Sequence, residues 1–327
     1  MPLRRRMTRP DPAPLSAWRL RAKRLGDLSE RFARPLGLVL SLVLLLVVLR
    51  QARDADWSVL LGNDARLSAT FLATFAAYYL LSPCAEWLIY TRLWGFDRSA
   101  FPALLRKFVA NELLLDYLGD VQFLAWAHAR RMGDGAPFAA VKDVTILSAL
   151  TGNLVTLALM VLAWPFVVSH LPGLSLRAIL VSLGVILVVS TVLLVLGKRI
   201  FSHPARTLAG IGAVLVLRTV GALALAAVLW HMLMPAAALW SLFLLATLRM
   251  IVSRLPLVPS KDLLFAGLAV IAFGRADEIA VTTAMIASLV LLAHVIVGAL
   301  LAIAHLASAR RRRSAAGDEA EGPDQSA

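Results

Sequence analysis

The sequence predicts an all-α polytopic integral membrane protein with about eight transmembrane helices. Three observations support this: 60% of the 327 residues are hydrophobic, only 16% are charged, and the mean hydropathy is +0.78. An ordinary soluble domain has about 45–50% apolar and about 25% charged residues, and a chain of this size cannot hide so much apolar surface in a globular core. The composition therefore excludes nucleic-acid binding as the meaning of the net charge of +13.

Apolar segments of about the length that crosses a bilayer recur along the chain. A helix needs about 20 residues to cross roughly 30 Å of hydrocarbon. The segments are 36–52, 67–91, 108–128, 144–168, 176–197, 207–231, 237–254, 256–273 and 279–306.

Two of these segments are irregular. Segment 108–128 carries three carboxylates, which are costly in lipid, and it predicts a re-entrant or interfacial helix between two basic clusters. Without it, eight crossings remain, the even number that two cytoplasmic tails require. Segment 256–273 begins with Pro256 and Pro259 and has few clean apolar residues, so it suits a half-helix better than a full span.

The two ends of the chain predict its orientation. Residues 1–35 hold ten Lys and Arg against three acids, and residues 307–327 hold four arginines and four acids. Basic clusters that flank spans stay on the cytoplasmic side. We therefore expect a basic cytoplasmic tail at 1–35, a transmembrane domain at 36–306 and a disordered cytoplasmic tail at 307–327. A lipid- or protein-binding role for either tail is the alternative.

Signatures of metal and cofactor chemistry are absent from the sequence. Cys84 is the only cysteine, so the chain has no internal disulfide and no cysteine-based metal cage. No two of the six histidines are three or four residues apart, and no P-loop, zinc-protease, nucleophile-elbow or dinucleotide motif occurs. We expect neither a cofactor nor a metal.

A row of acids is the first candidate site. Glu112, Asp116 and Asp120 follow Asn111 at four-residue spacing, which predicts one acidic face on a single helix. Like charges at this spacing repel each other and need water, cations or a bound ion nearby. The face is either the wall of a polar cavity or the solvent-exposed side of a helix that lies on the membrane.

Cations inside apolar segments are the second candidate site. Arg218 lies near the middle of its segment, where an unpaired arginine costs at least about 2.5–3.5 kcal/mol. It therefore predicts either contact with a substrate headgroup or a structural ion pair with an acid such as Glu86. Arg249 lies nearer an interface, where its side chain can also reach water.

The start of segment 256–273 is the third candidate. Ser260 or Asp262 can cap a helix that begins after Pro259, and a helix start within the membrane presents positive dipole to an anion. Lys261 reinforces that field. A broken span without a ligand is the alternative.

These constellations resemble the flippase-like family that includes the transmembrane region of lysylphosphatidylglycerol synthases. The likeness covers about residues 35–306. Its early motif matches Asn111, Gly119-Asp120 and Arg130 or Arg131, and its late proline motif matches Leu255 to Asp262. Ser260-Lys261 replaces the glycine pair of the family.

The resemblance implies a multi-pass inner-membrane protein whose partners are membrane lipids. Its function would be to bind and flip a polar, anionic lipid. The soluble aminoacyl-transfer domain of the synthases is absent, so a transporter is favoured over an enzyme. The resemblance and the local chemistry together give these substrate-binding candidates: Asn111, Glu112, Asp116, Asp120, Arg130, Arg131, Arg218, Arg249, Lys261 and Asp262.

The main alternative is an enzyme. The acids after Asn111 differ by one residue in spacing from the aspartate motif of magnesium-dependent intramembrane prenyltransferases, in which carboxylates hold Mg²⁺ ions that bind a diphosphate. The second aspartate motif of that class is missing. A small-solute transporter or a structural membrane protein also remains open.

Overall fold

The computed structural model describes residues 68–113, 118–133, 137–170, 176–254 and 276–320, and every regular element within these ranges is a helix. The predicted all-α class is therefore confirmed for this part of the chain. The predictions for the tail 1–35, the first span 36–52, segment 256–273 and residues 321–327 concern residues outside the described ranges. The elements are α3 (Ala69–Trp94), η1 (Arg98–Ala100), α4 (Phe101–Leu113), α5 (Leu118–Ala129), α6 (Phe138–His170), α7 (Leu176–Val195), α8 (Gly197–Ile200), α9 (Ala205–Leu233), α10 (Leu239–Arg254) and α12 (Ala276–Ala320).

Four helical stretches in the described residues are long and apolar enough to cross a bilayer: Ala69–Trp94, Phe138–Trp164, Ala205–Leu233 and Met285–Ala304. They correspond to four of the apolar segments in the sequence. Two shorter apolar stretches, Leu183–Val195 in α7 and Leu239–Val252 in α10, accompany them. By length and composition, the described part of the chain thus has four candidate membrane spans, which suits a membrane protein.

Local signals set the ends of α3 and the start of α4. Ser68 caps α3 by accepting a hydrogen bond from the Phe71 N–H at 3.1 Å. Gly95 ends the helix at φ 66°, and its N–H donates to the Thr91 carbonyl. Asp97 then caps η1, and hydrogen bonds from Ser99 hold the pKa of this exposed carboxyl below its usual value. The short connection returns the chain so that α4 packs against α3.

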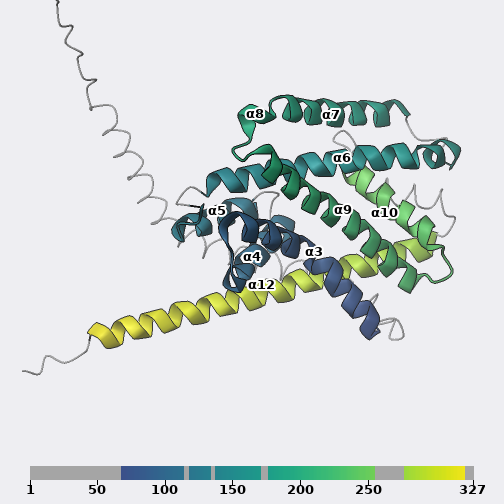
Figure 1. Cartoon of the computed structure of the whole chain (residues 1–327). Helices are drawn as coiled ribbons and strands as arrows, with labels where there is room; N and C mark the ends of the chain where they lie inside the picture. Colours follow the sequence, from purple (N-terminus) through teal and green to yellow (C-terminus); the bar gives the residue numbers. More distant parts are fainter. Residues whose placement is uncertain (1–67, 114–117, 134–136, 171–175, 255–275, 321–327) are drawn as a thin grey trace, which may run out of the picture. The chain divides into compact units, whose positions relative to one another are not determined.

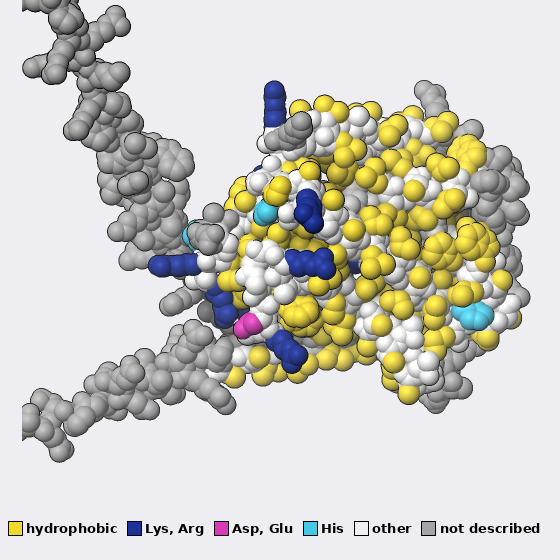
Figure 2. All heavy atoms as spheres, in the orientation of Figure 1, with side chains coloured by type: hydrophobic (Ala, Val, Ile, Leu, Met, Phe, Trp, Pro, Cys, Tyr) yellow, Lys and Arg dark blue, Asp and Glu magenta, His cyan; other side chains and the backbone are white. Residues whose placement is uncertain are grey.

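Helix α9 lies at the centre of the packing, in contact with α3, α6, α10 and α12 (Figure 1). Leu215, Leu229 and Leu233 on α9 are completely or almost completely buried. By contrast, Leu217 on the same helix and Val161 on α6 are more than 70% exposed, as expected of side chains that face lipid. Figure 2 shows hydrophobic side chains over most of the described surface in view, with Lys and Arg gathered toward one end.

Segment 108–128 is not one continuous helix, so the prediction of three acids on a single helical face is wrong. Lys107 and Asp120 are thirteen positions apart, so a continuous helix would separate them by about 20 Å along its axis, yet Lys107 Nζ lies 3.0 Å from Asp120 Oδ1. Helices α4 and α5 instead pack against each other. Gly119 allows this approach, since a Cβ there would collide with the Lys107 carbonyl and the Asn111 side chain.

The last helix also differs from the prediction. Helix α12 continues to Ala320, so residues 307–320 are helical where the sequence analysis expects a disordered tail. The physical reason is composition, because this stretch is dominated by alanine and arginine, two of the strongest helix formers.

Candidate functional site: a polar cavity within the helix bundle

A cavity of about 830 Å³ lies between α3, α4, α6, α9, α10 and α12, with Asp120 of α5 at its wall. This volume lies within the range of about 300–1,000 Å³ that is typical of small-ligand sites. Its lining is unusual for the centre of an apolar bundle because it holds acidic and basic side chains. The charged lining residues are Glu86, Lys107, Glu112, Asp120, Arg218 and Arg249.

A buried ion cluster joins three helices at one wall of the cavity. Lys107 Nζ on α4 lies 2.7 Å from Glu86 Oε2 on α3 and 3.0 Å from Asp120 Oδ1 on α5. Lys107 is only 4% exposed, and its ammonium lies 5.7 Å from the centre of the Phe123 ring. One cation thus compensates two carboxylates in a setting where an unpaired charge would be costly.

Asp120 has further donors besides Lys107. The Asn111 side-chain amide donates to Asp120 Oδ2 at 2.9 Å, and the Thr145 hydroxyl of α6 donates to Oδ1 at 2.8 Å. The Asn111 oxygen accepts from the Gly119 N–H at 2.6 Å. Both Asp120 oxygens are therefore engaged, and Asn111 fastens α4 to the start of α5.

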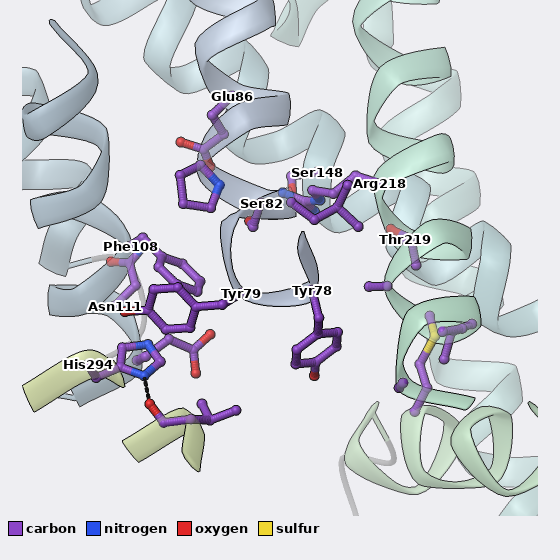
Figure 3. A pocket seen from close by; sticks show the side chains of 18 of the residues that line it. Tyr78, Tyr79, Ser82, Glu86, Phe108, Asn111, Ser148, Arg218, Thr219 and His294 are labelled. Carbon is purple, nitrogen blue, oxygen red and sulfur yellow. Dashed lines mark hydrogen bonds between the residues drawn. The ribbon is translucent and has the colours of Figure 1, made fainter. Parts of the chain in front are cut away.

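Arg218 lies on α9 at another wall of the same cavity, beside Ser148 of α6 (Figure 3). Its Nη2 donates to the Ser148 hydroxyl at 3.0 Å. Within the described residues this is its only hydrogen bond, and no carboxylate lies within ion-pair distance. A guanidinium has five N–H donors in a fixed planar fork. Most of the Arg218 N–H donors therefore have no partner among the described residues.

An aromatic group forms a third wall. The rings of Tyr79, Phe108 and His294 lie with their centres 5.0–5.3 Å apart, and Figure 3 shows them together on one side of the cavity. His294 Nδ1 lies 2.7 Å from the Val290 carbonyl oxygen. The Tyr79 hydroxyl and His294 Nε2 are buried and have no hydrogen-bond partner among the described residues.

Glu112 and Arg249 complete the charged lining. Both line the cavity, as does Tyr78. Each also makes an interaction of its own with the rest of the protein. Among the described residues, three acids and three cations line the cavity.

The structure brings five of the ten predicted site residues to this cavity: Asn111, Glu112, Asp120, Arg218 and Arg249. Arg130 and Arg131 are exposed and do not line it. The Arg130 guanidinium instead lies 4.9 Å from the centre of the Trp126 ring, a cation–π contact. Asp116, Lys261 and Asp262 lie outside the described residues.

Several cavity residues were missed by the sequence analysis, chiefly Lys107, Thr145, Ser148 and His294. In the sequence Lys107 stands beside Arg106 in one of the two basic clusters that flank segment 108–128, which suggests only a topology signal. Its one available signal was its position four residues before Asn111, which places both side chains on the same helical face. Glu86 was considered as a partner for Arg218, whereas the structure pairs it with Lys107.

Within the described residues no group of three or more His, Cys, Asp or Glu side chains is arranged to hold a metal ion. No family model, curated protein or solved structure matches the chain. The cavity and its charges must therefore be interpreted on their own chemistry.

Proposed function

We propose that the protein binds a polar, anionic lipid by its headgroup and moves it across the inner membrane. The observation that carries the proposal is Arg218, a cation in the middle of a 29-residue apolar helix that lines a cavity and has only the Ser148 hydroxyl as a described hydrogen-bond partner. A phosphate oxygen is the natural acceptor for its remaining N–H groups.

Burial and position support this choice. An arginine this far from either end of its helix cannot easily reach water by extending along the helix, so it needs a partner inside the bundle. The carboxylate that could have been that partner, Glu86, is paired with Lys107. The cavity has room for a headgroup, and the apolar outer faces of the helices suit acyl chains that remain in the bilayer.

We propose the fuller topology as part of the same model: eight crossings, both termini cytoplasmic, and α4–α5 as a re-entrant helical pair. The 13 residues of α4 rise only about 20 Å, short of a full crossing. Exposed arginines stand at the end of α3, at the end of α5 and at the start of α9, namely Arg92, Arg130, Arg131 and Arg206. The positive-inside rule assigns these helix ends to the cytoplasm.

A scrambling assay tests the function. Proteoliposomes of phosphatidylcholine with a trace of acyl-labelled fluorescent phosphatidylglycerol are treated with membrane-impermeant dithionite. We expect the wild type to expose inner-leaflet lipid to quenching, and Arg218→Gln to slow this at least about tenfold, since charged hydrogen bonds contribute about 1.5–3 kcal/mol. The control Arg206→Gln removes an exposed arginine from the start of the same helix and should behave as wild type.

Two comparisons sharpen the assay. Labelled phosphatidylcholine should cross more slowly than labelled phosphatidylglycerol if the anionic headgroup is recognised. Liposomes loaded with radiolabelled glycerol phosphate should retain it if the anion must be carried by a lipid. Wild-type quenching no faster than in protein-free liposomes, or equal rates for wild type and Arg218→Gln, would overturn the proposal.

The prenyltransferase alternative gains no support from the described acids. Both oxygens of Asp120 are already engaged by Lys107, Asn111 and Thr145, and Mg²⁺ would have to displace these donors. Repeating the assay with EDTA separates the two functions, because lipid movement should survive the chelator while a magnesium-dependent enzyme would stop.

A further inference from the structure

We infer that Lys107 is a positioning residue for the anion site: it holds the Glu86 carboxylate on its own side of the cavity and so leaves Arg218 free to bind the lipid phosphate. The inference deepens the function proposed above and rests on it. Whether Arg218 can offer its positive charge to a ligand depends on which cation holds the Glu86 carboxylate.

Two cavity cations, Lys107 and Arg218, compete for one carboxylate, Glu86. Glu86 on α3 lines the cavity together with Lys107 on α4 and Arg218 on α9. The contact at 2.7 Å is to Lys107. Lys107 is held for this contact because it also bonds Asp120 at 3.0 Å and lies near the Phe123 ring.

The two carboxylates of the cluster depend on Lys107 to different extents. Asp120 also accepts hydrogen bonds from Asn111 and Thr145, so it would keep two donors if the ammonium were removed. Within the described residues, Glu86 has Lys107 as its only hydrogen-bond or ion-pair partner. Loss of Lys107 would therefore leave Glu86 as the carboxylate in need of a new cation.

Arg218 is the cation that Glu86 would then approach. A buried carboxylate that faces a guanidinium across a polar cavity gains more from pairing than from remaining alone. Pairing would neutralise Arg218 and remove the positive charge that attracts a phosphate. Lys107 thus controls the charge that the cavity offers, although it need not touch the lipid itself.

The test measures binding of spin-labelled phosphatidylglycerol to the full-length protein in phosphatidylcholine nanodiscs. We expect Lys107→Met to weaken binding at least about tenfold, although Arg218 is unchanged. The double variant Lys107→Met/Glu86→Gln should restore binding to within about threefold of wild type, because the competing charge is gone. Lys107→Arg should retain binding. Lys142→Met, which removes a lysine that is paired with Asp143 and lies outside the cavity lining, is the matched control.

The single variant Glu86→Gln keeps the inference testable if Lys107→Met fails to fold. It preserves the Lys107–Asp120 contact and removes a negative charge near the bound anion, so we expect binding to tighten about twofold or more. Weaker binding in Glu86→Gln would overturn the inference, as would equal loss in Lys107→Met and in the double variant. Inorganic phosphate added as a competitor shows whether a free anion can take the same place, and it should displace the label from wild type and not from Arg218→Gln.

Failure of the proposed function has a different signature. If wild type and Arg218→Gln bind the lipid equally, the anion site itself is wrong whatever the Lys107 variants do. If Arg218→Gln loses binding and Lys107→Met does not, the function stands and only the positioning role of Lys107 falls.

Discussion

The Asn111 side-chain oxygen accepts a hydrogen bond from the Gly119 N–H at 2.6 Å. This contact joins the last turn of α4 to the first turn of α5, and through the Asn111 amide it also orients Asp120. The geometry of the charged cavity wall thus depends on how closely two short helices can approach. The same contact explains why glycine stands at position 119.

Gly119→Ala should destabilise the protein by about 1–3 kcal/mol and weaken lipid binding. The added Cβ would collide with the Lys107 carbonyl and the Asn111 side chain, and both belong to or flank the ion cluster. Thermal unfolding in detergent, followed by tryptophan fluorescence, measures the effect.

The matched control is Gly210→Ala in α9, where an added Cβ meets nothing within 4 Å. The control should be neutral or stabilising by about 0.5–1 kcal/mol. Equal melting temperatures for the two variants would contradict the close approach of α4 and α5.

A second buried carboxylate fastens the loop before α9. Asp143 is fully buried, and its Oδ2 accepts hydrogen bonds from the N–H groups of Ser202 and His203 at 2.8 and 2.9 Å. The ring of His203 lies 2.8 Å from the same oxygen. We expect Asp143→Ala to cost about 2–4 kcal/mol, since several donors lose their acceptor together.

The variant Asp143→Ala should keep the headgroup selectivity of the wild type, because Asp143 does not line the cavity. Melting temperature and the ratio of phosphatidylglycerol to phosphatidylcholine binding are measured on the same sample. Asp97→Ala, which removes an exposed capping carboxylate, provides the control and should lower the melting temperature much less. A changed lipid ratio in Asp143→Ala would show that this loop takes part in recognition.

The long helices could be predicted from the sequence because length and composition alone decide them. Segments 67–91 and 207–231 correspond to α3 and α9, with ends moved by two or three residues. Helices α4 and α5 could not be predicted in this way. The acids at four-residue spacing fit one helix as well as two, and the contact between Asn111 and Gly119 that separates them is tertiary.

The ion cluster could not be predicted from the sequence either, because it also depends on tertiary contacts. Glu86 and Arg218 were evident as intramembrane charges, because each stands in an otherwise apolar segment. Lys107 stands beside Arg106 at a point where basic residues are ordinary topology signals. Only the packing of α3 on α4 and of α4 on α5 shows that Lys107, rather than Arg218, takes the Glu86 carboxylate.

Tyr79→Phe should leave stability unchanged or slightly raised. The Tyr79 hydroxyl is buried without a hydrogen-bond partner among the described residues, and removal of an unsatisfied polar group relieves a desolvation penalty of about 1–3 kcal/mol. The ring itself would keep its contacts with Phe108 and His294. Tyr90→Phe is the matched variant, since its hydroxyl is also buried without a described partner but lies outside the cavity lining.

The two tyrosine variants should differ in lipid binding. If a headgroup oxygen uses the Tyr79 hydroxyl, Tyr79→Phe weakens binding of labelled phosphatidylglycerol while Tyr90→Phe does not. Equal binding in both variants would remove Tyr79 from the headgroup site. A clear fall in melting temperature for Tyr79→Phe would show that its hydroxyl has a partner in the folded protein and would contradict the expected gain.

The proposed topology places both termini in the cytoplasm and can be tested with single cysteines. Cys84 is exposed on the surface of α3 and is first replaced by serine. Leu20→Cys and Ala315→Cys are then introduced separately, and intact cells are treated with a membrane-impermeant maleimide. Neither cysteine should react until the membrane is permeabilised, because both stand in basic segments that the positive-inside rule retains in the cytoplasm.

Phe201→Cys, in the loop between α8 and α9, tests the same side independently of the tails. Labelling of one tail alone from outside would require an odd number of crossings, and α4–α5 would then no longer have to be re-entrant.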